Sequence, residues 1–318
     1  MSVGHRHKRI ALAARALVLS VGYGLWSGAA VAAPPSSFLR ELAPGVYVHA
    51  GQYADLDSPA RGDSANLGVV IGRRCVGVVD SGGALATGRA LKAAIAALTP
   101  LPVCYVINTH VHFDHVLGNA AFVGPATEFV GHADLAAAIA ANIEYFAERF
   151  ATELGSPGQG AAVIAPTVLV KDSATLDLGG RHLHITAVAT AHSTTDITVL
   201  DDASDILFTG DLLFRERLPV LDGSLTGWLT WLHAAMAKHY AQVVPGHGPP
   251  DAAWPAGAEP ELRYFQALLT ATRGAIAQGM MLEDAVQSVA AAERARWLLS
   301  ERAHPLNVSR AFRELEWE

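Results

Sequence analysis

Short apolar runs, each bounded by glycine or by polar residues, recur along the chain after residue 40. Such runs are typical of buried strands, and they predict one group of strands before residue 110 and a second group after residue 170. The first group comprises 46–48, 67–71, 75–79 and 103–107. The second comprises 174–178, 182–188, 197–200, 206–209 and a strand that ends at His247.

Segments with apolar residues at helical spacing lie between these strands. They predict a helix at 85–98, a long alanine-rich helix at 133–154 and a helix near 228–239. Two strand-rich halves with helices between them are typical of an α+β fold. The pattern therefore predicts a four-layer αββα sandwich.

Beyond Pro255 the composition shifts to helix-forming residues. Helices are expected at 259–278, at 281–299 and in the final segment. Because no long polar linker separates this part from the rest, we expect a domain at 34–255 and a helical extension at 256–318 packed on the same domain.

The first 33 residues have the pattern of a secretory signal peptide. Histidine, arginine and lysine fill positions 5–9, an apolar stretch follows at 16–26, and small residues at 30–33 suit cleavage. The apolar stretch is too short to span a bilayer easily, which favours a cleaved signal over a retained anchor. We therefore expect a periplasmic protein with no stable membrane association after cleavage.

The charge of the chain argues against nucleic acid as a partner. Lys and Arg number 23 against 30 Asp and Glu, which gives a formal net charge of −7, and removal of the basic signal makes the remainder more acidic. Proteins that bind phosphate backbones need a positive surface. A small molecule is therefore the expected partner.

Two cysteines, Cys75 and Cys104, lie near the starts of two predicted strands joined by one helix. They can occupy neighbouring parallel strands, but the sequence does not determine the distance between their Cα atoms. A disulfide and a pair of buried thiols are both consistent with the sequence.

Four side chains that bind metals occupy six consecutive positions, namely His110, His112, Asp114 and His115. Residues two apart in an extended segment point the same way, so His110 and His112 can bind one ion. Asp114 and His115, carried round the turn, can then reach a second ion. Paired cations a few ångströms apart are a recognised hydrolytic device.

Further candidate ligands come at the ends of other apolar runs. His192, Asp211 and His247 each follow or end such a run, and Asp80 ends an earlier one. Layered folds of helices and strands collect their site residues where strands give way to loops. The sequence therefore predicts that these residues lie together.

This order of residues resembles the metallo-β-lactamase superfamily over about residues 40–250. The resemblance implies the αββα sandwich, with metals at one edge between the two sheets. It also implies two metals that share one carboxylate. The ligands would be His110, His112 and His192 for the first metal, Asp114, His115 and His247 for the second, and Asp211 for both.

The resemblance gives Asp80 a supporting role, in which it orients ligands through hydrogen bonds. Loss of such a partner typically weakens a metal site about 10–100-fold. A role for Asp80 as the cap of the following helix stays open.

The expected cofactor is two Zn²⁺ ions per chain, because histidine-rich ligand sets favour zinc; iron or manganese stays open because carboxylate bridges accept both. Two cations that share a water lower its pKa toward about 7, so a bridging hydroxide would be the nucleophile. Asp114 would orient this hydroxide or move its proton, which makes it the candidate catalytic residue.

Asp211 distinguishes this chain from the true β-lactamases that it resembles around 192–196. Those enzymes have a cysteine ligand and a nearby lysine that holds the drug's carboxylate, whereas an aspartate is what glyoxalase II and the lactonases carry. The expected reaction is hydrolysis of an ester, thioester, lactone or related bond, with β-lactam hydrolysis as an alternative. Arg215 and Arg217 are candidates for binding an anionic substrate. The alternative is that both are solvated charges in a loop.

Two further segments have expected roles around the metals. The polar, glycine-containing loop at 52–64 is expected to close over them as a lid. Asp222, Gly223 and Ser224 have the pattern of a turn and helix cap, and they are also candidates for the rim of the cleft.

The export signal and the segment at 307–318 resemble the periplasmic branch called quinoprotein relay system zinc metallohydrolases. That resemblance implies a link to a periplasmic quinoprotein system. Two rival functions stay open. A mononuclear iron site of His110, His192 and Asp211 would serve a persulfide dioxygenase-like sulfur-oxidising enzyme, and a non-catalytic accessory protein of a quinoprotein dehydrogenase system would use the fold as a scaffold.

Overall fold

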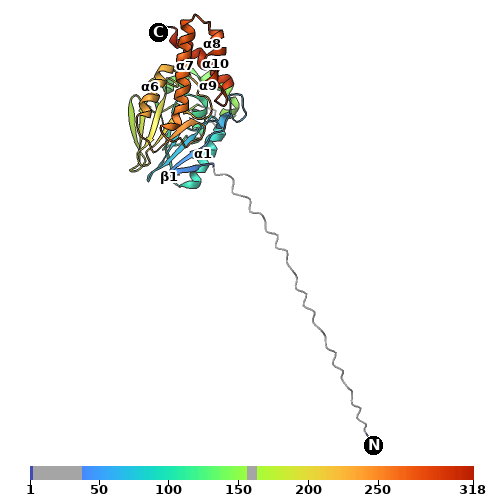
Figure 1. Ribbon diagram of the computed structural model, residues 1–318. Helices are drawn as coiled ribbons and strands as arrows, with labels where there is room; N and C mark the ends of the chain where they lie inside the picture. The colour runs from blue at the N-terminus through green and yellow to red at the C-terminus, as the bar shows by residue number, and fades with distance from the viewer. Residues whose placement is uncertain (3–37, 156–162) are drawn as a thin grey trace. The chain divides into compact units, whose positions relative to one another are not determined.

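Two β-sheets form the centre of the structure, a computed structural model that describes residues 1–2, 38–155 and 163–318 (Figure 1). Contacts join Ser37–Glu318 into one unit. The predicted signal peptide at 1–33 lies outside the described residues, apart from Met1 and Ser2.

The first sheet has seven strands in sequence order, antiparallel from β1 to β4 and parallel from β4 to β7. Its strands are β1 (Arg40–Ala43), β2 (Val46–His49), β3 (Leu67–Ile71), β4 (Val76–Val79), β5 (Val103–Ile107), β6 (Glu128–His132) and β7 (Val168–Val170). Because β4 and β5 are parallel, their carboxyl ends share one edge. The residues that follow them, Asp80 and 108–115, therefore meet there.

The second sheet has five strands in the order β12-β11-β10-β9-β8. These are β8 (Ser173–Asp177), β9 (His182–Ala187), β10 (Ile197–Asp201), β11 (Ile206–Phe214) and β12 (Gln242–His247). The predicted strand at 206–209 is too short, because parallel pairing with β12 continues as far as Phe214 opposite His247. Asp211 consequently lies inside a buried strand rather than at its end.

Three apolar clusters separate the layers of the sandwich. Val70, Ile107 and Phe208 belong to the cluster between the sheets. Leu91 and Ile95 of α1 (Leu85–Leu98) pack on the outer face of the first sheet. Helix α6 (Leu225–Met236) covers the second sheet, with Trp228 fully buried. These layers confirm the predicted αββα sandwich.

The predicted helix at 133–154 is wrong as a single element. The chain forms three short helices instead, α3 (Leu135–Ala141), α4 (Ile143–Arg149) and α5 (Ala151–Leu154). Asn142 departs from helical dihedral angles, and its side-chain amide donates to the carbonyl of Ala138. This local bond competes with the regular helical pattern, an effect that alanine-rich spacing does not reveal.

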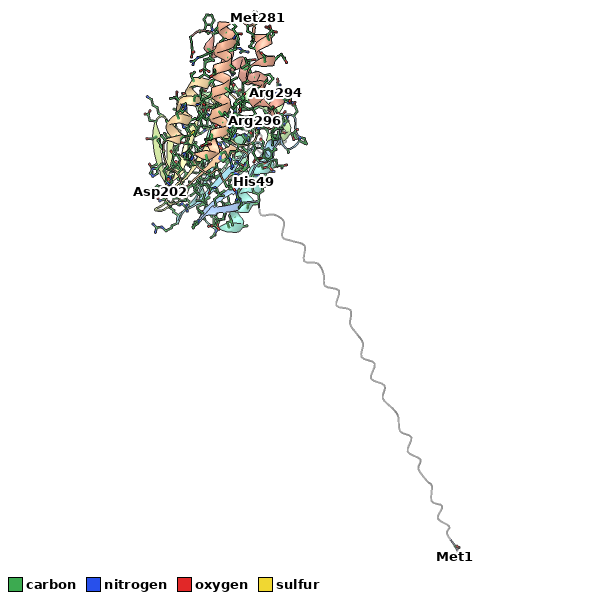
Figure 2. All side chains as sticks on the ribbon, in the orientation of Figure 1. Met1, His49, Asp202, Met281, Arg294 and Arg296 are labelled. Atoms are coloured by element: carbon green, nitrogen blue, oxygen red, sulfur yellow. A yellow bond between two sulfur atoms is a disulfide. The ribbon has the colours of Figure 1, made fainter. Side chains whose placement is uncertain are left out.

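The C-terminal part forms α7 (Glu259–Ala277), α8 (Leu282–Ser288), α9 (Ala291–Arg294) and α10 (Ser300–Leu315), gathered at one end of the unit (Figure 1). The predicted helix at 281–299 is interrupted, since Ala290 and Leu299 have positive φ angles. Met281, between α7 and α8, is exposed at the end of the helical region (Figure 2). Buried residues of α7 and α10 share one cluster with α6, which confirms a helical extension on the sandwich.

Two further observations concern the disulfide and the absence of a membrane-spanning helix among the described residues. Cys75 and Cys104 form a disulfide next to the paired starts of β4 and β5, with their Cα atoms 5.7 Å apart, which decides between the two states that the sequence allowed. No helix in the described parts of the chain has the length and apolarity needed to cross a membrane.

Candidate metal centre

Seven imidazole and carboxylate side chains converge at the edge where both sheets end. They come from the β5–α2 loop and α2 (Phe113–Val116), from the segment before β10, and from β11 and β12. All the ligands predicted from the sequence are brought together in two groups: His110, His112, His192 and Asp211 in one, and Asp114, His115 and His247 in the other.

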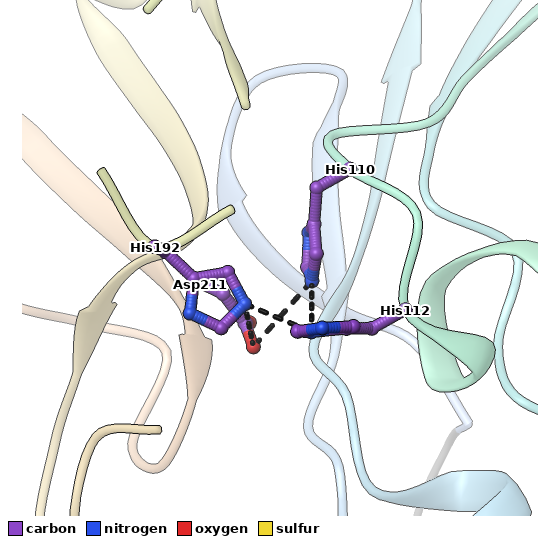
Figure 3. Close-up of side chains that lie close together, drawn as sticks. All are labelled: His110, His112, His192 and Asp211. Atoms are coloured by element: carbon purple, nitrogen blue, oxygen red, sulfur yellow. Dashed lines mark hydrogen bonds and ion pairs between the residues drawn. The ribbon is translucent and has the colours of Figure 1, made fainter. Parts of the chain in front are cut away.

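In the first group, three imidazole nitrogens and one carboxylate oxygen face one point (Figure 3). His112 Nδ1 lies 3.1 Å from His110 Nε2 and 2.9 Å from His192 Nε2. Asp211 Oδ2 lies 3.7 Å from His110 Nε2 and 3.6 Å from His192 Nε2. A tetrahedral zinc site with Zn–N bonds of about 2.0–2.1 Å would place its ligand atoms about 3.3–3.4 Å apart. The observed spacing therefore fits one such ion.

Asp211 lies between the first group and the second. Its Oδ1 is 3.1 Å from His115 Nε2, and its Oδ2 is 3.3 Å from His247 Nε2. Asp114 Oδ2 is 3.3 Å from the same His247 nitrogen. The Asp211 carboxylate is thus placed where it can contact cations in both groups.

Each of the five histidines has a partner for the ring nitrogen that points away from the centre. His115 Nδ1 donates to Asp80, His247 Nδ1 to the Ser64 carbonyl, His192 Nδ1 to the Val220 carbonyl, His112 Nε2 to Asp222, and His110 Nδ1 to Thr109 Oγ1. These acceptors fix the tautomer, so the other nitrogen of every ring presents a lone pair inward. This arrangement is what metal ligation requires.

Asp80 is the hub of this outer layer of hydrogen bonds. Its Oδ1 accepts from the Thr109 amide, and its Oδ2 accepts from both Thr109 Oγ1 and His115 Nδ1, each at 2.8 Å. The side chain is buried, and the residue has a φ of 59°, a strained conformation that aims the carboxylate. The alternative role as a helix cap is excluded, because α1 begins after Ala84.

Two buried polar atoms of the site have no hydrogen-bond partner within the described residues, His115 Nε2 and Asp211 Oδ1. They are 3.1 Å apart, but they are not aligned for a hydrogen bond. A buried polar atom without a partner costs free energy, so such atoms are rare in folded proteins. Both atoms lie where a cation would satisfy them, which supports a metal at this position.

Burial favours the neutral imidazole at two of the three histidines of the first group, whereas at His112 the Asp222 carboxylate outweighs burial and raises the pKa. Burial lowers the pKa of His110 well below its usual value, with the nearby His115 as the next cause. Burial and the neighbouring His112 lower the pKa of His192 to about 3. Neutral imidazole is the form that binds metals, so these two rings can act as ligands at neutral pH.

The second group is rich in negative charge. Burial alone would lower the pKa of His115, but the Asp211, Asp80 and Asp114 carboxylates outweigh it and raise the pKa well above the usual range. The same carboxylates that favour a proton on His115 would favour a divalent cation beside it.

Asp222 is a site residue that the sequence did not single out as a metal partner. The predicted helix cap is correct for Ser224, whose Oγ accepts from the Gly227 amide. The Asp222 carboxylate instead accepts from His112 Nε2 at 3.3 Å, and it also pairs with Arg310 of α10. An aspartate in a turn is common, so no sequence signal could have identified this contact.

A cavity of about 310 Å³ opens beside the two groups. Arg217 lines it, whereas Arg215 does not and bonds to the carbonyl of Pro249. Ala54, Asp55 and Leu56 of the predicted lid loop also line the cavity. At the end of that loop, Ser64 Oγ donates to Asp114 Oδ2 at 2.8 Å. The loop therefore reaches both the cavity and a candidate ligand.

Several solved structures share this fold. A sec-alkylsulfatase from Pseudomonas sp. matches with a TM-score of 0.66 at 17% identity, covering 89% of this chain. The chain spans about half of that protein's length, 51%. A metallo-β-lactamase from Pontibacter korlensis matches with a TM-score of 0.58 at 19% identity, and the match covers 72% of this chain and 98% of the Pontibacter chain. No curated protein matches the chain.

A family model described as the metallo-beta-lactamase superfamily matches residues 60–247. This range spans more than half of the chain and begins and ends with the two segments that carry Ser64 and His247. It contains every candidate ligand of both groups. The chain therefore belongs to the metallo-β-lactamase superfamily.

Proposed function

We propose that this protein is a periplasmic hydrolase that uses two divalent cations, Zn²⁺ in its native form, to cleave an ester, thioester, lactone or related bond in a small molecule. The observation that carries the proposal is the orientation of five histidines. Each has its outer nitrogen held by a protein acceptor, and the inner atoms form two groups around Asp211. A complete and oriented ligand set of this kind argues against a purely structural scaffold.

When bound, a pair of such cations supplies a nucleophile at neutral pH and polarises the scissile group. Asp114 has the position to orient that nucleophile and to move its proton. Burial would raise the pKa of Asp114, but His115 and His247 outweigh it and keep the pKa below its usual value. Asp114 is therefore ionised at neutral pH, and Ser64 Oγ, which donates to its Oδ2, fixes its direction.

The cavity indicates a substrate that joins an apolar group to an anionic group. Its apolar lining includes Leu56, Val111, Phe113, Phe146 and Leu306. Arg217 contributes a cation that stacks near the Phe214 ring and lies 3.1 Å from His247 Nδ1. Among the described residues, no carboxylate forms an ion pair with Arg217. A guanidinium of this kind suits a carboxylate or sulfate of the substrate.

A secondary alkyl sulfate is a second candidate substrate. The alkylsulfatase structure covers 89% of this chain, against 72% for the Pontibacter enzyme, so the similarity extends further along the chain. Such a molecule also combines an anion with an apolar tail, in agreement with the cavity lining. β-Lactam hydrolysis is less favoured, because Asp211 replaces the cysteine ligand of the lactamases that this chain resembles.

The periplasmic location rests on the signal pattern at 1–33 and agrees with the disulfide between Cys75 and Cys104. Disulfides persist in oxidising compartments such as the periplasm and are rare in the cytosol. A link to a periplasmic quinoprotein system stays a prediction from the sequence resemblance.

The test is a metal analysis of the purified protein followed by a hydrolysis panel. We expect two zinc ions per chain and turnover of at least one ester, thioester, lactone or secondary alkyl sulfate, with a penicillin and a cephalosporin as comparison substrates. One iron per chain together with oxygen consumption on a persulfide would overturn the proposal in favour of sulfur oxidation. A full metal content without turnover, and with a stoichiometric protein partner, would favour the accessory role.

The role of Arg217 is tested by Arg217→Met, with Arg215→Met as the matched control outside the cavity. We expect Arg217→Met to raise KM for an anionic substrate about tenfold or more, since a charge-assisted hydrogen bond contributes roughly 1.5–3 kcal/mol. The neutral methyl ester of the same substrate should be little affected. Equal losses in both variants, or for both substrates, would remove Arg217 from substrate binding.

A further inference from the structure

A short segment, residues 219–226, lies directly behind two ligands of the first metal group; it is irregular as far as Ser224 and ends in the first two residues of α6, and we call it the backing segment. Its Val220 carbonyl accepts from His192 Nδ1 at 2.8 Å, and its Asp222 carboxylate accepts from His112 Nε2 at 3.3 Å. The Asp222 amide also donates to the His192 carbonyl at 3.1 Å. The position of this segment therefore sets the orientation of both rings.

Three polar side chains of α10 contact the backing segment, Asn307, Arg310 and Glu314. Their spacing of three and four residues places them on one face of the helix. They belong to the C-terminal segment at 307–318, more than 80 residues away in sequence from the backing segment.

Asn307 holds the middle of the backing segment. Its side chain is fully buried, its Oδ1 accepts from the Leu221 amide at 2.8 Å, and its Nδ2 donates to the Pro219 carbonyl at 2.8 Å. Leu221 and Pro219 flank Val220, the residue whose carbonyl holds His192. Asn307 thus binds the peptide unit that contains this carbonyl, through the Leu221 amide, and the unit before it, through the Pro219 carbonyl.

Arg310 and Glu314 hold the two flanking parts. Arg310 pairs with Asp222 Oδ1, while Oδ2 of the same carboxylate accepts from His112. Glu314 accepts from the Leu225 amide at 2.7 Å and the Thr226 amide at 3.0 Å, which satisfies the free amides at the start of α6. One face of α10 therefore contacts the backing segment along its length.

We propose that α10 is a positioning element for the metal group of His110, His112, His192 and Asp211, and that Asn307 and Arg310 are its positioning residues. The backing segment has no helix or strand pairing between Pro219 and Ser224. Its path is therefore defined by these side-chain bonds together with the backbone bonds of the Asp222 and Ser224 amides to the His192 and Ala191 carbonyls. The inference rests on the proposed function only in that the site must bind a cation.

The effect should be selective for that group. In the second group, His115 is oriented by Asp80, and both His247 and Asp114 are held by Ser64. Among the described hydrogen bonds of these three residues, none involves α10. A disturbance of the helix should therefore weaken the first group more than the second.

The experiment is a titration of the metal-free full-length protein with Co²⁺ alone, followed by visible absorption. The intensity of Co²⁺ bands depends on the ligand geometry, which a merely structural change in stability would leave unaltered. The test variant is Arg310→Ala, because this half-exposed side chain can be removed without opening the core. Arg313→Ala, which removes another arginine of the same helix, is the matched control.

We expect Arg310→Ala to weaken only one of the two Co²⁺ binding steps, by about 3–10-fold, a smaller effect than the 10–100-fold of a direct partner. The Co²⁺ spectrum of that step should change, Arg310→Lys should restore part of the affinity, and Arg313→Ala should match the native protein. Asn307→Ala should have a larger effect on the same step.

Native-like affinities and spectra in Arg310→Ala would overturn the inference while leaving the proposed function intact. Equal weakening of both binding steps would overturn it as well, because the selectivity for one group is then absent. Failure of the native protein to bind Co²⁺ would instead overturn the proposed function and this inference together.

Discussion

At the scale of single residues, the metal centre depends on atoms that would not touch the cations themselves. Asp80 shows this most clearly, since one carboxylate holds His115 directly and His110 through Thr109. Its positive φ is tolerated by aspartate and asparagine better than by most residues. Asparagine at this position therefore changes the charge without changing the backbone.

Asp80→Asn should weaken cation binding by about 10–100-fold, most strongly in the second group. The amide would present a donor to His115 Nδ1, which would move the ring proton to Nε2 and remove its lone pair from the site. Competition with a chelator measures the affinity. Asp202→Asn, which changes an exposed carboxylate beside His182 that belongs to neither ligand group, is the control, and an equal effect in both variants would contradict the role of Asp80.

Asp196 predicts a pH dependence of folding stability. Burial raises the pKa of Asp196 to about 6, and it outweighs the hydrogen bonds from Ser193, which lower that pKa. Because the folded pKa lies above the unfolded value of 3.8, the group's contribution to stability is complete below that value and is lost as the pH rises through about 6. The loss is about 3 kcal/mol at most, at 1.36 kcal/mol per pKa unit.

Asp196→Asn should therefore flatten the dependence of the unfolding free energy between about pH 4 and pH 7, the range that spans the titration. Asparagine can keep both bonds, accepting from the Ser193 amide and donating to its hydroxyl. Urea unfolding across this range measures the slope. Asp202→Asn should leave the slope in this range nearly unchanged, because the pKa of Asp202 is lowered and its contribution is lost only as the pH falls below about 3.8. Parallel slopes in Asp196→Asn and the native protein would refute the assignment.

At the scale of elements, the close approach of β11 and β12 fixes the bridging carboxylate. A Cβ atom on Gly246 would lie 1.9 Å from Asp211 Oδ1 and 2.5 Å from the Gly210 carbonyl carbon. Only glycine allows the two strands to pass this closely. Gly246 is therefore a requirement for the position of Asp211, although it carries no ligand atom.

Gly246→Ala should displace Asp211 and weaken both cation-binding steps, because that carboxylate serves both groups. Isothermal titration with Zn²⁺ measures this. Gly274→Ala is the matched control, since a Cβ there meets nothing within 4 Å and lies inside α7. It should raise stability by about 0.5–1 kcal/mol and leave Zn²⁺ binding unchanged. Unchanged binding in Gly246→Ala would show that β11 can shift at no cost.

Elements with strong local patterns could be predicted from the sequence, whereas those that depend on distant contacts could not. The strands β3 and β5 match their predicted bounds because an apolar run between polar or glycine residues defines each. The break at Asn142 depends on one side-chain bond that the apolar spacing of 133–154 hides. The length of β11 depends on its partner β12, and so it was underestimated.

The residues of the candidate site also divide into those that could be predicted from the sequence and those that could not. The density of ligands at 110–115 made the metal centre predictable, and Asp80 followed from its place at a strand end. Asp222 was expected only at a turn, a helix cap or the rim of the cleft, and it does line the cavity. Its contact with His112 could not be predicted, because the two residues are 110 positions apart and Asp222 is held from α10, 88 residues away. The state of Cys75 and Cys104 also required the distance between two strands.

At the scale of the whole molecule, the cations should contribute to stability. A ligand present at 100 times its dissociation constant stabilises the folded state by about 2.7 kcal/mol. Proteins of this size lose roughly 2–4 °C in melting temperature per kcal/mol. Removal of the metals with a chelator should therefore lower the melting temperature by about 5 °C or more, and added Zn²⁺ should restore it. Identical calorimetric traces before and after chelation would contradict a bound metal pair.

The two sheets supply the ligands unequally, and this division has a mechanical consequence. His110, His112, Asp114 and His115 follow β5 of one sheet, whereas Asp211 and His247 lie on strands of the other. Cations held by both sets would cross-link the sheets at their shared edge, much as the disulfide cross-links β4 to β5 within one sheet. The covalent link is intrinsic to the chain, but the link between sheets depends on the supply of metal. Sliding of one sheet over the other is therefore a motion that metal availability would control.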